Sequence, residues 1–389
     1  MESQATPCSQ RFTLIDRKAP RVQLSDLKIV CVIADLGLGG AQKNLLAVAE
    51  WLSHEGCSVS LITLRRVSQE LHSVQDSIRR DNGSSLVPFR WYKVFELLER
   101  LRDLRRRVMR FAPDLVITFG DTTNVLTLIA CMGLRLKVVV SERVDPRSHP
   151  IPLRFRLLRR LLYPGATRVA MVGKDSADWA RKLWPRWRVY WLPNAVTPAK
   201  EAIGPLSPTE TVIVGAGRFV KQKGFDLLIR AFALIAPRIP HCRVCLYGDG
   251  PEHRSLVQLA ERLGVASRVE LIPPTVGTNW LRGSGRIFVL PSLYEGFPNA
   301  LAEAMAQGYA TVSFDCPGGP SMLVDHGKNG LLVPTGDIEA LAIAIEQLMT
   351  DDALRMRLGL AAKEVVHQYS PARVKELWIR LIQGCITEV

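Results

Sequence analysis

The sequence predicts an α/β protein of two tandem domains, each a doubly wound, Rossmann-like parallel sheet with helices on both faces. Three observations support this fold class. Short runs rich in Val, Ile and Leu alternate with amphipathic helical runs, as in sheets that are buried on both faces. Four prolines and a glycine interrupt the alternation at 193–209, as a domain linker does. Beyond this segment the alternation starts again.

The strands are predicted from the apolar runs. In the first half, the run at 28–34 leads through a glycine-rich turn to a helix expected at 41–54. The other strand-like runs of this half are 58–63, 114–119, 136–141, 167–172 and 188–193. Those of the second half are 211–217, 242–250, 268–274, 286–292, 310–317 and 330–334. In such sheets ligands bind at the carboxyl ends of the strands, here expected between the two domains.

Domain boundaries follow from these runs. We expect residues 1–26 to be a flexible tail, residues 27–193 the first domain, and residues 194–369 the second. Residues 370–389 carry a last helix, expected at about 371–387. The polar N-terminus lacks the apolar core of a secretory signal, and no apolar run reaches the length of a membrane span.

The positive charge lies in one half of the chain. Residues 1–195 contain 32 Lys and Arg against 18 Asp and Glu, whereas residues 196–389 contain 19 of each, which together give the net charge of +14. The first half therefore suits an anionic surface or substrate. We expect no nucleic-acid partner, because neither an aromatic-basic platform nor a recognition motif is present.

The eight cysteines do not predict a metal or disulfide site. The only close pair, Cys242 and Cys245, falls on an expected strand, where positions i and i+3 point to opposite faces. We expect buried, reduced thiols and no metal site.

Two glycine loops follow the first strands of the two domains. In the loop at 35–44, Gly37 and Gly39 begin a dinucleotide fingerprint, but Gln42 replaces its last glycine. An NADP site using Arg65 and Arg66 stays open, as does a tight turn without a ligand. The simpler interpretation is a turn that presents backbone N–H groups to an anion at a helix start.

The second loop, at 214–226, contains Gly217 and two cations, Arg218 and Lys223, at the carboxyl end of a strand. A guanidinium binds oxygen atoms as a fork and an ammonium acts as a point charge, so the pair suits a diphosphate. Ordinary solvated loop cations are the alternative.

Two glutamates, Glu295 and Glu303, flank an expected helix start. Pro298 is placed as the first helical residue, which leaves the N–H groups at 299–301 for an anion. The helix rises about 7.5 Å from Pro298 to Glu303, too far for a glycosidase acid/base pair, although side-chain reach leaves this open. The carboxylates are expected to bind two parts of one extended ligand. Surface glutamates without function are the alternative.

These residues resemble a known family. The segment at 295–303, EGFPNALAE, has the E-x7-E signature of the glycosyl transferases group 1 family (glycosyltransferase family 4). The segments GRFVKQKGFDLLIRAF, YGDGPE and GGPSMLVDHGKNGLLVP resemble its donor-phosphate segment, its next strand end and its closing segment. GGAQKNL and SERVDP are similar to motifs of members that use UDP-sugars. The resemblance covers about residues 28–387.

The resemblance implies a GT-B fold, in which two Rossmann-like domains face an interdomain cleft and the last helix crosses back to the first domain. It also implies retaining transfer from a nucleotide-sugar without a metal or other cofactor. Carried over, Arg218 and Lys223 would bind the diphosphate and Glu295 would hold hydroxyls of the donor sugar. These three would form the catalytic set, with cations in the place of Mg²⁺ at the leaving UDP.

The resemblance also implies a set of donor-binding residues. Glu303 would hold the nucleotide ribose, and the helix start would bind the distal phosphate and the sugar. Gly39 and Gly40 would let the first domain approach the same phosphate. The full donor-binding set is Gly39, Gly40, Gly217, Asn299, Ala300, Leu301 and Glu303.

The chain departs from the family pattern at two places. Met322 stands where many relatives have a glutamate. Many relatives also have a histidine where this chain reads SERVDP. The nearest histidine is His149, which we do not expect to be catalytic. The resemblance implies a retaining front-face transfer that uses the leaving phosphate as its base, so the chain can be active without this histidine.

Two basic stretches indicate the acceptor side. Residues 90–110 show a helical apolar stripe at 94, 97, 98, 101, 104 and 108. Residues 147–165 combine arginines with more apolar residues than a narrow core stripe needs. The second stretch suits a helix on an anionic membrane, contacted by Arg154, Arg156, Arg159 and Arg160. A core-packed helix with a solvated basic face is the alternative for each.

These expectations define a function. A hexose or N-acetylhexosamine would move from a UDP-sugar to a glycan linked to polyprenyl diphosphate, on the inner face of the cytoplasmic membrane. A UDP-sugar epimerase or hydrolase on the same fold is one alternative. A non-catalytic nucleotide-sugar-binding protein is the other.

Overall fold

The structure is a computed structural model that describes residues 24–37, 39–65, 73–82, 94–197, 212–273 and 287–387. Most of the expected tail and of the linker, together with Arg66, lies outside the described residues. The chain divides into two compact units. The first comprises Met1–Arg143, Pro150–Pro193 and Val374–Val389, and the second comprises Val144–His149 and Asn194–Arg373.

The first unit contains a seven-stranded sheet in the order β3-β2-β1-β4-β5-β6-β7. All neighbouring strands run parallel. The strands are β1 (Lys28–Ile33), β2 (Ser58–Thr63), β3 (Arg79–Asp81), β4 (Leu115–Phe119), β5 (Lys137–Glu142), β6 (Arg168–Met171) and β7 (Val189–Trp191). The order reverses between β1 and β4, the place where doubly wound sheets bind ligands.

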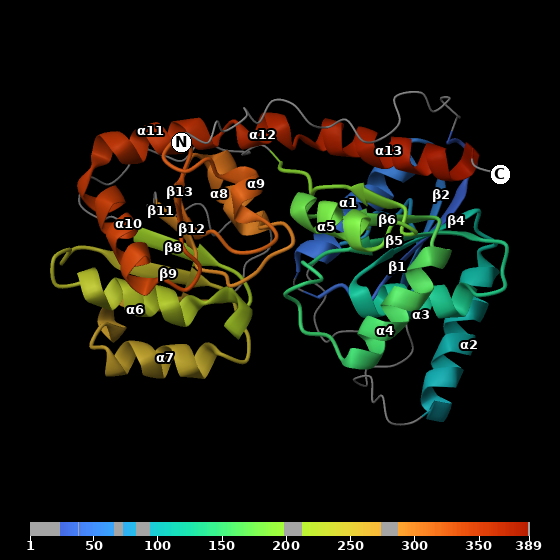
Figure 1. Ribbon diagram of the computed structural model, residues 1–389, viewed down its shortest axis with the longest axis horizontal. Helices are drawn as coiled ribbons and strands as arrows, with labels where there is room; N and C mark the ends of the chain where they lie inside the picture. Colours follow the sequence, from blue (N-terminus) through green and yellow to red (C-terminus); the bar gives the residue numbers. More distant parts are fainter. Residues whose placement is uncertain are drawn as a thin grey trace. The chain divides into compact units, whose positions relative to one another are not determined.

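Helices cover both faces of this sheet. Figure 1 shows α2, α3 and α4 on one side of it and α13 on the other. The helices are α1 (Gly40–His54), α2 (Val94–Arg110), α3 (Asp121–Cys131), α4 (Leu153–Leu162), α5 (Lys174–Leu183) and α13 (Pro371–Thr387), with a 3₁₀ turn, η1 (Tyr163–Gly165). In α2, Leu104 and Val108 are fully buried in the core. The first basic stretch therefore forms a core-packed helix, and its residues 90–93 lie outside the described ones.

Residues from Val374 onward belong to the first unit. Trp378 of α13 stacks on Phe119 with ring centroids 5.7 Å apart. At the end of α13, the Lys137 ammonium donates to the carbonyl oxygens of Cys385 (2.6 Å) and Ile386 (3.0 Å). A cation there stabilises the last carbonyl groups of the helix.

The second unit contains a six-stranded parallel sheet in the order β10-β9-β8-β11-β12-β13. The strands are β8 (Val212–Ala216), β9 (Arg243–Tyr247), β10 (Val269–Ile272), β11 (Ile287–Leu290), β12 (Ala310–Phe314) and β13 (Leu331–Val333). The helices are α6 (Phe225–Ile235), α7 (His253–Arg262), α8 (Asn299–Gln307), α9 (Pro320–Leu323), α10 (Ile338–Thr350), α11 (Asp352–Ala362) and α12 (Val365–Gln368), with the turns η2 (Lys221–Lys223) and η3 (Ala266–Arg268). Figure 1 shows α6 and α7 on one side of this sheet and α8 and α11 on the other.

The two parallel-sheet α/β units confirm the predicted fold class. Every strand expected from an apolar run is present. A strand buried on both faces needs a continuous run of residues such as Val and Ile, so these strands can be recognised in the sequence. The sequence analysis missed β3, an edge strand of sequence Arg-Arg-Asp without an apolar residue. It is held by pairing with β2 and by the buried Arg107, whose guanidinium binds the Asp81 carboxylate at 2.8 Å.

One short segment differs from the expected division. Residues 144–149, expected in the first domain, group with the second unit. The Asp145 N–H donates to the Glu295 carbonyl oxygen (3.2 Å), and the ring of His149 lies 6.2 Å from that of Tyr294. These contacts explain why residues 144–149 group with the second unit. None of the described helices is long and apolar enough to cross a membrane.

Candidate active site

In the second unit, the loop after β8 is held against the loop after β9. Gly217 donates its N–H to the Tyr247 carbonyl (2.9 Å), and Phe219 donates to the Asp249 carbonyl (2.8 Å). A Cβ atom at Gly248 would lie 1.9 Å from the Gly217 carbonyl oxygen, so only glycine permits this approach. The glycines of the YGDGPE segment therefore fix the loop that carries Arg218.

The same β8 loop is also tied to the loop after β11. Gln222 accepts the Leu293 N–H (2.8 Å), and its side-chain amide donates to the Tyr294 carbonyl (2.8 Å). Gly224, at φ 62°, lies so close that a Cβ would approach the Pro291 carbonyl oxygen to 2.1 Å. The turn η2 and the β11 loop thus form one rigid surface at the carboxyl edge of the sheet.

This surface brings Lys223 and Glu295 together. The Lys223 ammonium lies 2.6 Å from Glu295 Oε1, and the two side chains are 18% and 7% exposed. The Glu295 N–H donates to the Pro317 carbonyl (3.1 Å), and a Cβ at Gly318 would lie 2.1 Å from the Glu295 carbonyl oxygen. Glu295 is therefore fixed by its side chain and by its backbone.

Arg218 is exposed beside this pair, in the same loop as Lys223. Both charged side chains, Arg218 and Glu295, affect the pKa of the nearby Tyr294 hydroxyl. Burial raises the pKa of Tyr294, the Arg218 cation lowers that pKa, and the Glu295 anion raises it. The arrangement thus places an exposed guanidinium near a buried, ion-paired carboxylate.

The helix start differs from the prediction by one residue. Pro298 has ψ 78° and caps α8, so Asn299 is the first helical residue. The Asn299 N–H donates to the Phe297 carbonyl (2.9 Å) and is not available to a ligand. The N–H groups of Ala300 and Leu301 belong to the first turn, where the helix offers no acceptor. The expected anion site is therefore narrowed to these two donors.

Glu303 lies in the second turn of α8 and is half-buried. Asn194, which the sequence analysis did not single out, is buried and donates from its side-chain amide to Asn299 Oδ1 (2.9 Å). No periodic or charge signal identifies it, because it lies at the start of the proline-rich linker. Met322, in α9, is also half-buried, and its carbonyl accepts the Tyr369 hydroxyl (3.1 Å).

In the first unit, Asp35 organises the glycine loop. Gly39 caps α1 and Gly40 is its first residue. Asp35 Oδ1 accepts the Gly37 N–H (3.0 Å), and Asp35 Oδ2 lies 2.6 Å from the Arg65 guanidinium. Arg65 is thus engaged by an acid of the same edge, which weighs against the NADP interpretation.

A further cation occupies the carboxyl edge of the first sheet. Arg143 follows β5, and its guanidinium carbon lies 4.5 Å from the centroid of the Phe119 ring. Burial lowers the pKa of Arg143 to about 9, which still leaves the side chain mostly charged at neutral pH. The sequence analysis quoted this residue within SERVDP but did not select it.

One membrane-facing prediction is wrong. Arg159 is buried, with 5% of its side chain exposed, and lies 3.5 Å from the buried Glu142 carboxylate. The Tyr163 hydroxyl donates to the same carboxylate at 2.5 Å, and burial together with Glu142 raises the pKa of Tyr163. Arg159 therefore balances a buried acid and cannot contact lipid. Arg154, Arg156 and Arg160 are exposed.

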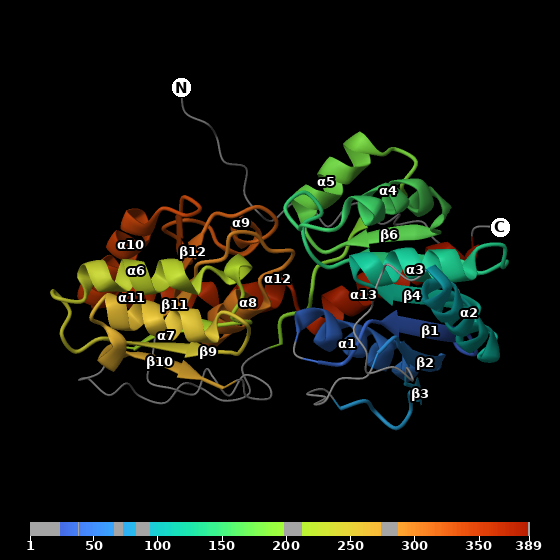
Figure 2. The same ribbon diagram turned by 90° about the horizontal axis from the view of Figure 1, so that it is seen from below.

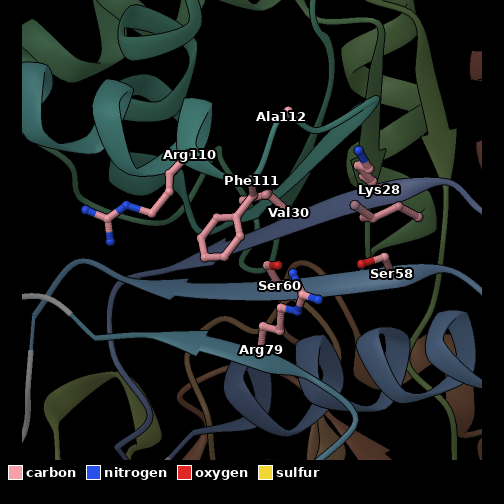
Figure 3. Close-up of a pocket in the computed structure, with 9 residues that line it drawn as sticks. Lys28, Val30, Ser58, Ser60, Arg79, Arg110, Phe111 and Ala112 are labelled. Atoms are coloured by element: carbon pink, nitrogen blue, oxygen red, sulfur yellow. The ribbon is translucent and has the colours of Figure 1, made fainter.

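Within the described residues, a cavity of about 230 Å³ lies at the opposite edge of the first sheet (Figure 3). Lys28, Ser58 and Arg79, which line it, are the first residues of β1, β2 and β3. The amino ends of the strands are not where doubly wound sheets bind nucleotides. This cavity is thus separate from the candidate site.

The Cys242 and Cys245 thiols do not form a reactive pair. Burial raises the pKa of Cys242 to about 12 and also raises that of Cys245. Both are free thiols. Because the thiolate is the reactive form, these side chains are inert at neutral pH.

Comparison with known proteins defines the class. Residues 197–365 match the family model "Glycosyl transferases group 1", and residues 39–195 match "Glycosyl transferase 4-like domain". The chain therefore belongs to the group 1 glycosyltransferases, with a 4-like domain ahead of the group 1 domain.

Two curated relatives show the range of similarity. An exopolysaccharide phosphotransferase of Streptomyces coelicolor is 32% identical over 78% of this chain, which spans only 32% of that protein. An α-1,4-N-acetyl-D-galactosaminyltransferase of Campylobacter jejuni is 24% identical over 92% of this chain and 98% of its own length. Its full name specifies a diphosphoundecaprenol-linked glycan as the molecule it acts on.

Solved structures show the GT-B fold. Sucrose-phosphate synthase of Thermosynechococcus elongatus superposes with a TM-score of 0.81 at 18% identity, over 93% of this chain and all of that one. HepE of Anabaena, in complex with UDP and glucose, superposes with a TM-score of 0.75 at 18% identity, with the same coverage of both chains.

The Lys223–Glu295 pair generates a stability prediction. We expect Lys223→Met to lower the free energy of unfolding by about 3 kcal/mol, because a buried carboxylate would lose its counter-charge. Adding Glu295→Gln should recover most of this loss. Urea unfolding of both variants, with the exposed neighbour Lys221→Met as the control, measures the effect. Equal stability of the single and double variants would contradict the pairing.

Proposed function

We propose that this protein transfers a hexose or N-acetylhexosamine from a UDP-sugar to a glycan carried on polyprenyl diphosphate. In this proposal the anomeric configuration is retained, no metal ion takes part, and the reaction occurs on the inner face of the cytoplasmic membrane. The observation that carries the proposal is the grouping of Arg218, Lys223, Glu295 and the α8 start on loops tied to one another. A guanidinium, an ammonium and helix N–H groups suit a diphosphate, and a carboxylate suits sugar hydroxyls.

Each group has a role in this proposal. Arg218 and Lys223 stabilise the charge that develops on the leaving UDP, and the Ala300 and Leu301 N–H groups bind its distal phosphate. Glu295 Oε1 is engaged by Lys223. Its Oε2, which forms no hydrogen bond within the described part of the chain, accepts hydroxyls of the donor sugar. Glu303 accepts the ribose hydroxyls.

The reaction balances without a protein base. The acceptor hydroxyl oxygen forms a bond to the anomeric carbon on the face from which UDP departs. The bond from that carbon to the phosphate oxygen breaks, and the acceptor proton moves to the leaving phosphate. The side chains therefore need only position the reactants and offset negative charge.

The comparisons support the donor and the acceptor as follows. HepE was solved with UDP and glucose. The Campylobacter relative is named for transfer to a diphosphoundecaprenol-linked glycan. In this proposal Gly217 belongs to the donor site of the second unit, as a position where backbone approaches phosphate.

A ligand panel followed by a transfer assay tests the proposal. A UDP-sugar at 100 times its dissociation constant should stabilise the protein by about 2.7 kcal/mol, whereas GDP-sugars should have no effect. With a polyprenyl-diphosphate glycan, radiolabelled sugar should enter the lipid fraction with retained configuration. Release of free sugar without growth of the glycan would instead indicate a hydrolase.

We expect Arg218→Ala to lower kcat/KM by about 100- to 1,000-fold, the usual effect of losing one donor to a developing charge. Its unfolding free energy should stay unchanged, because the side chain is exposed. Lys221→Ala is the matched control in the adjoining turn. A rate within threefold of wild type would remove Arg218 from the leaving-group role.

The two glutamates should differ in calorimetry. We expect Glu303→Gln to weaken the binding of UDP itself, because its carboxylate accepts the ribose hydroxyls. Glu295→Gln should not weaken UDP, because it removes the negative charge that neutralises Lys223. It should weaken the UDP-sugar relative to UDP, since one neutral-to-charged hydrogen bond contributes about 1.5–3 kcal/mol. Equal losses of UDP affinity in both variants would contradict this division.

Transfer should proceed in EDTA at the rate seen with added Mg²⁺. The physical reason is that the cations and the helix start already offset the charge of the diphosphate. The measurement is the initial rate after chelation, with and without Mg²⁺ or Mn²⁺ restored. Complete loss in EDTA that either ion reverses would overturn metal independence.

A further inference from the structure

Helix α4 carries an apolar stripe that the fold leaves uncovered. Leu153, Leu157 and Leu161 are 60%, 54% and 73% exposed. Residues four apart advance by about 40° around a helix, so the three form one stripe about 12 Å long. A single exposed leucine is ordinary, but three in register form a continuous apolar patch.

Exposed arginines border this stripe on both sides. By helical geometry Arg156 and Arg160 lie along one side of it and Arg154 along the other. The helix sequence LRFRLLRRLL contains no acid. Phe155 and Arg159 are buried and fix the opposite face, and Figure 2 shows α4 on the opposite side of the first unit from α1.

The charge of the first half favours one occupant for this surface. Residues 1–195 hold the whole excess of 14 positive charges, which selects an anionic partner. Nucleic acid would use the arginines but not a leucine stripe. A bilayer with anionic headgroups uses both, because leucines enter the acyl boundary while guanidinium groups remain at the phosphates.

We infer that the α4 surface, formed by Leu153, Leu157, Leu161, Arg154, Arg156 and Arg160, docks the first unit on an anionic lipid bilayer. The leucines insert at the headgroup boundary and the three arginines bind lipid phosphates. The proposed function gives a reason for this docking, but binding to lipid alone does not require a donor or an acceptor.

Two triple variants separate the contribution of the arginines to vesicle binding from that of the leucines, as measured by vesicle co-sedimentation. Arg154→Gln/Arg156→Gln/Arg160→Gln should lose about 100-fold in affinity for phosphatidylglycerol-containing vesicles at low salt and most of the salt dependence. Leu153→Gln/Leu157→Gln/Leu161→Gln should lose at least about 10-fold and keep the salt dependence. Pure phosphatidylcholine vesicles should bind the wild type weakly.

Matched controls remove equal numbers of exposed side chains in the second unit. Arg230→Gln/Arg254→Gln/Arg262→Gln and Ile343→Gln/Met356→Gln/Leu360→Gln should bind vesicles like the wild type. Circular dichroism and thermal unfolding of every variant report folding, and UDP affinity measured without lipid tests the proposed function separately. Wild-type vesicle binding by both α4 variants, or equal weakening by the control variants, would overturn the inference.

Discussion

The ion pair between Lys223 and Glu295 is the contact on which the candidate site depends. Glu295 is buried, and a buried carboxylate is stable only when a cation and hydrogen bonds offset its charge. The ammonium reaches it at 2.6 Å because Gly224 adopts a left-handed conformation and lets η2 pack on the Pro291 carbonyl. Three glycine contacts, at residues 224, 248 and 318, thus determine where two charged side chains meet.

This pairing also sets the charge that a donor would encounter. Lys223 and Glu295 largely neutralise each other, so Arg218 supplies the net positive charge beside them. The start of α8 adds about half a charge more. A site with so small an excess needs both the guanidinium and the helix start to bind a diphosphate, which is why removing Arg218 should affect turnover strongly although the side chain is exposed.

The sequence analysis was correct where the fold requires one particular type of residue. Buried parallel strands need continuous Val and Ile, and close backbone contacts need glycine, so the strands and the two glycine loops followed from composition and spacing. Asn194 and β3 could not be predicted in this way, because an amide in a linker and an Arg-Arg-Asp edge strand carry no periodic signal. Residues 144–149 were misplaced because long-range contacts, here with Glu295, decide which unit a connecting segment joins. The capping role of Pro298 depended on its ψ angle, which sequence does not specify.

The arginines of the first half show the same limit when a binding surface is predicted from sequence. Arg107, Arg159 and Arg160 are alike in sequence, each within a basic amphipathic helix. Burial separates them: Arg107 binds Asp81 and Arg159 binds Glu142, whereas Arg160 faces solvent beside Leu161. Counting arginines alone therefore overestimates the exposed basic surface, because some of them pair with buried acids. What remains exposed on α4 is smaller than the composition suggested, but it lies next to an apolar stripe that composition alone did not locate.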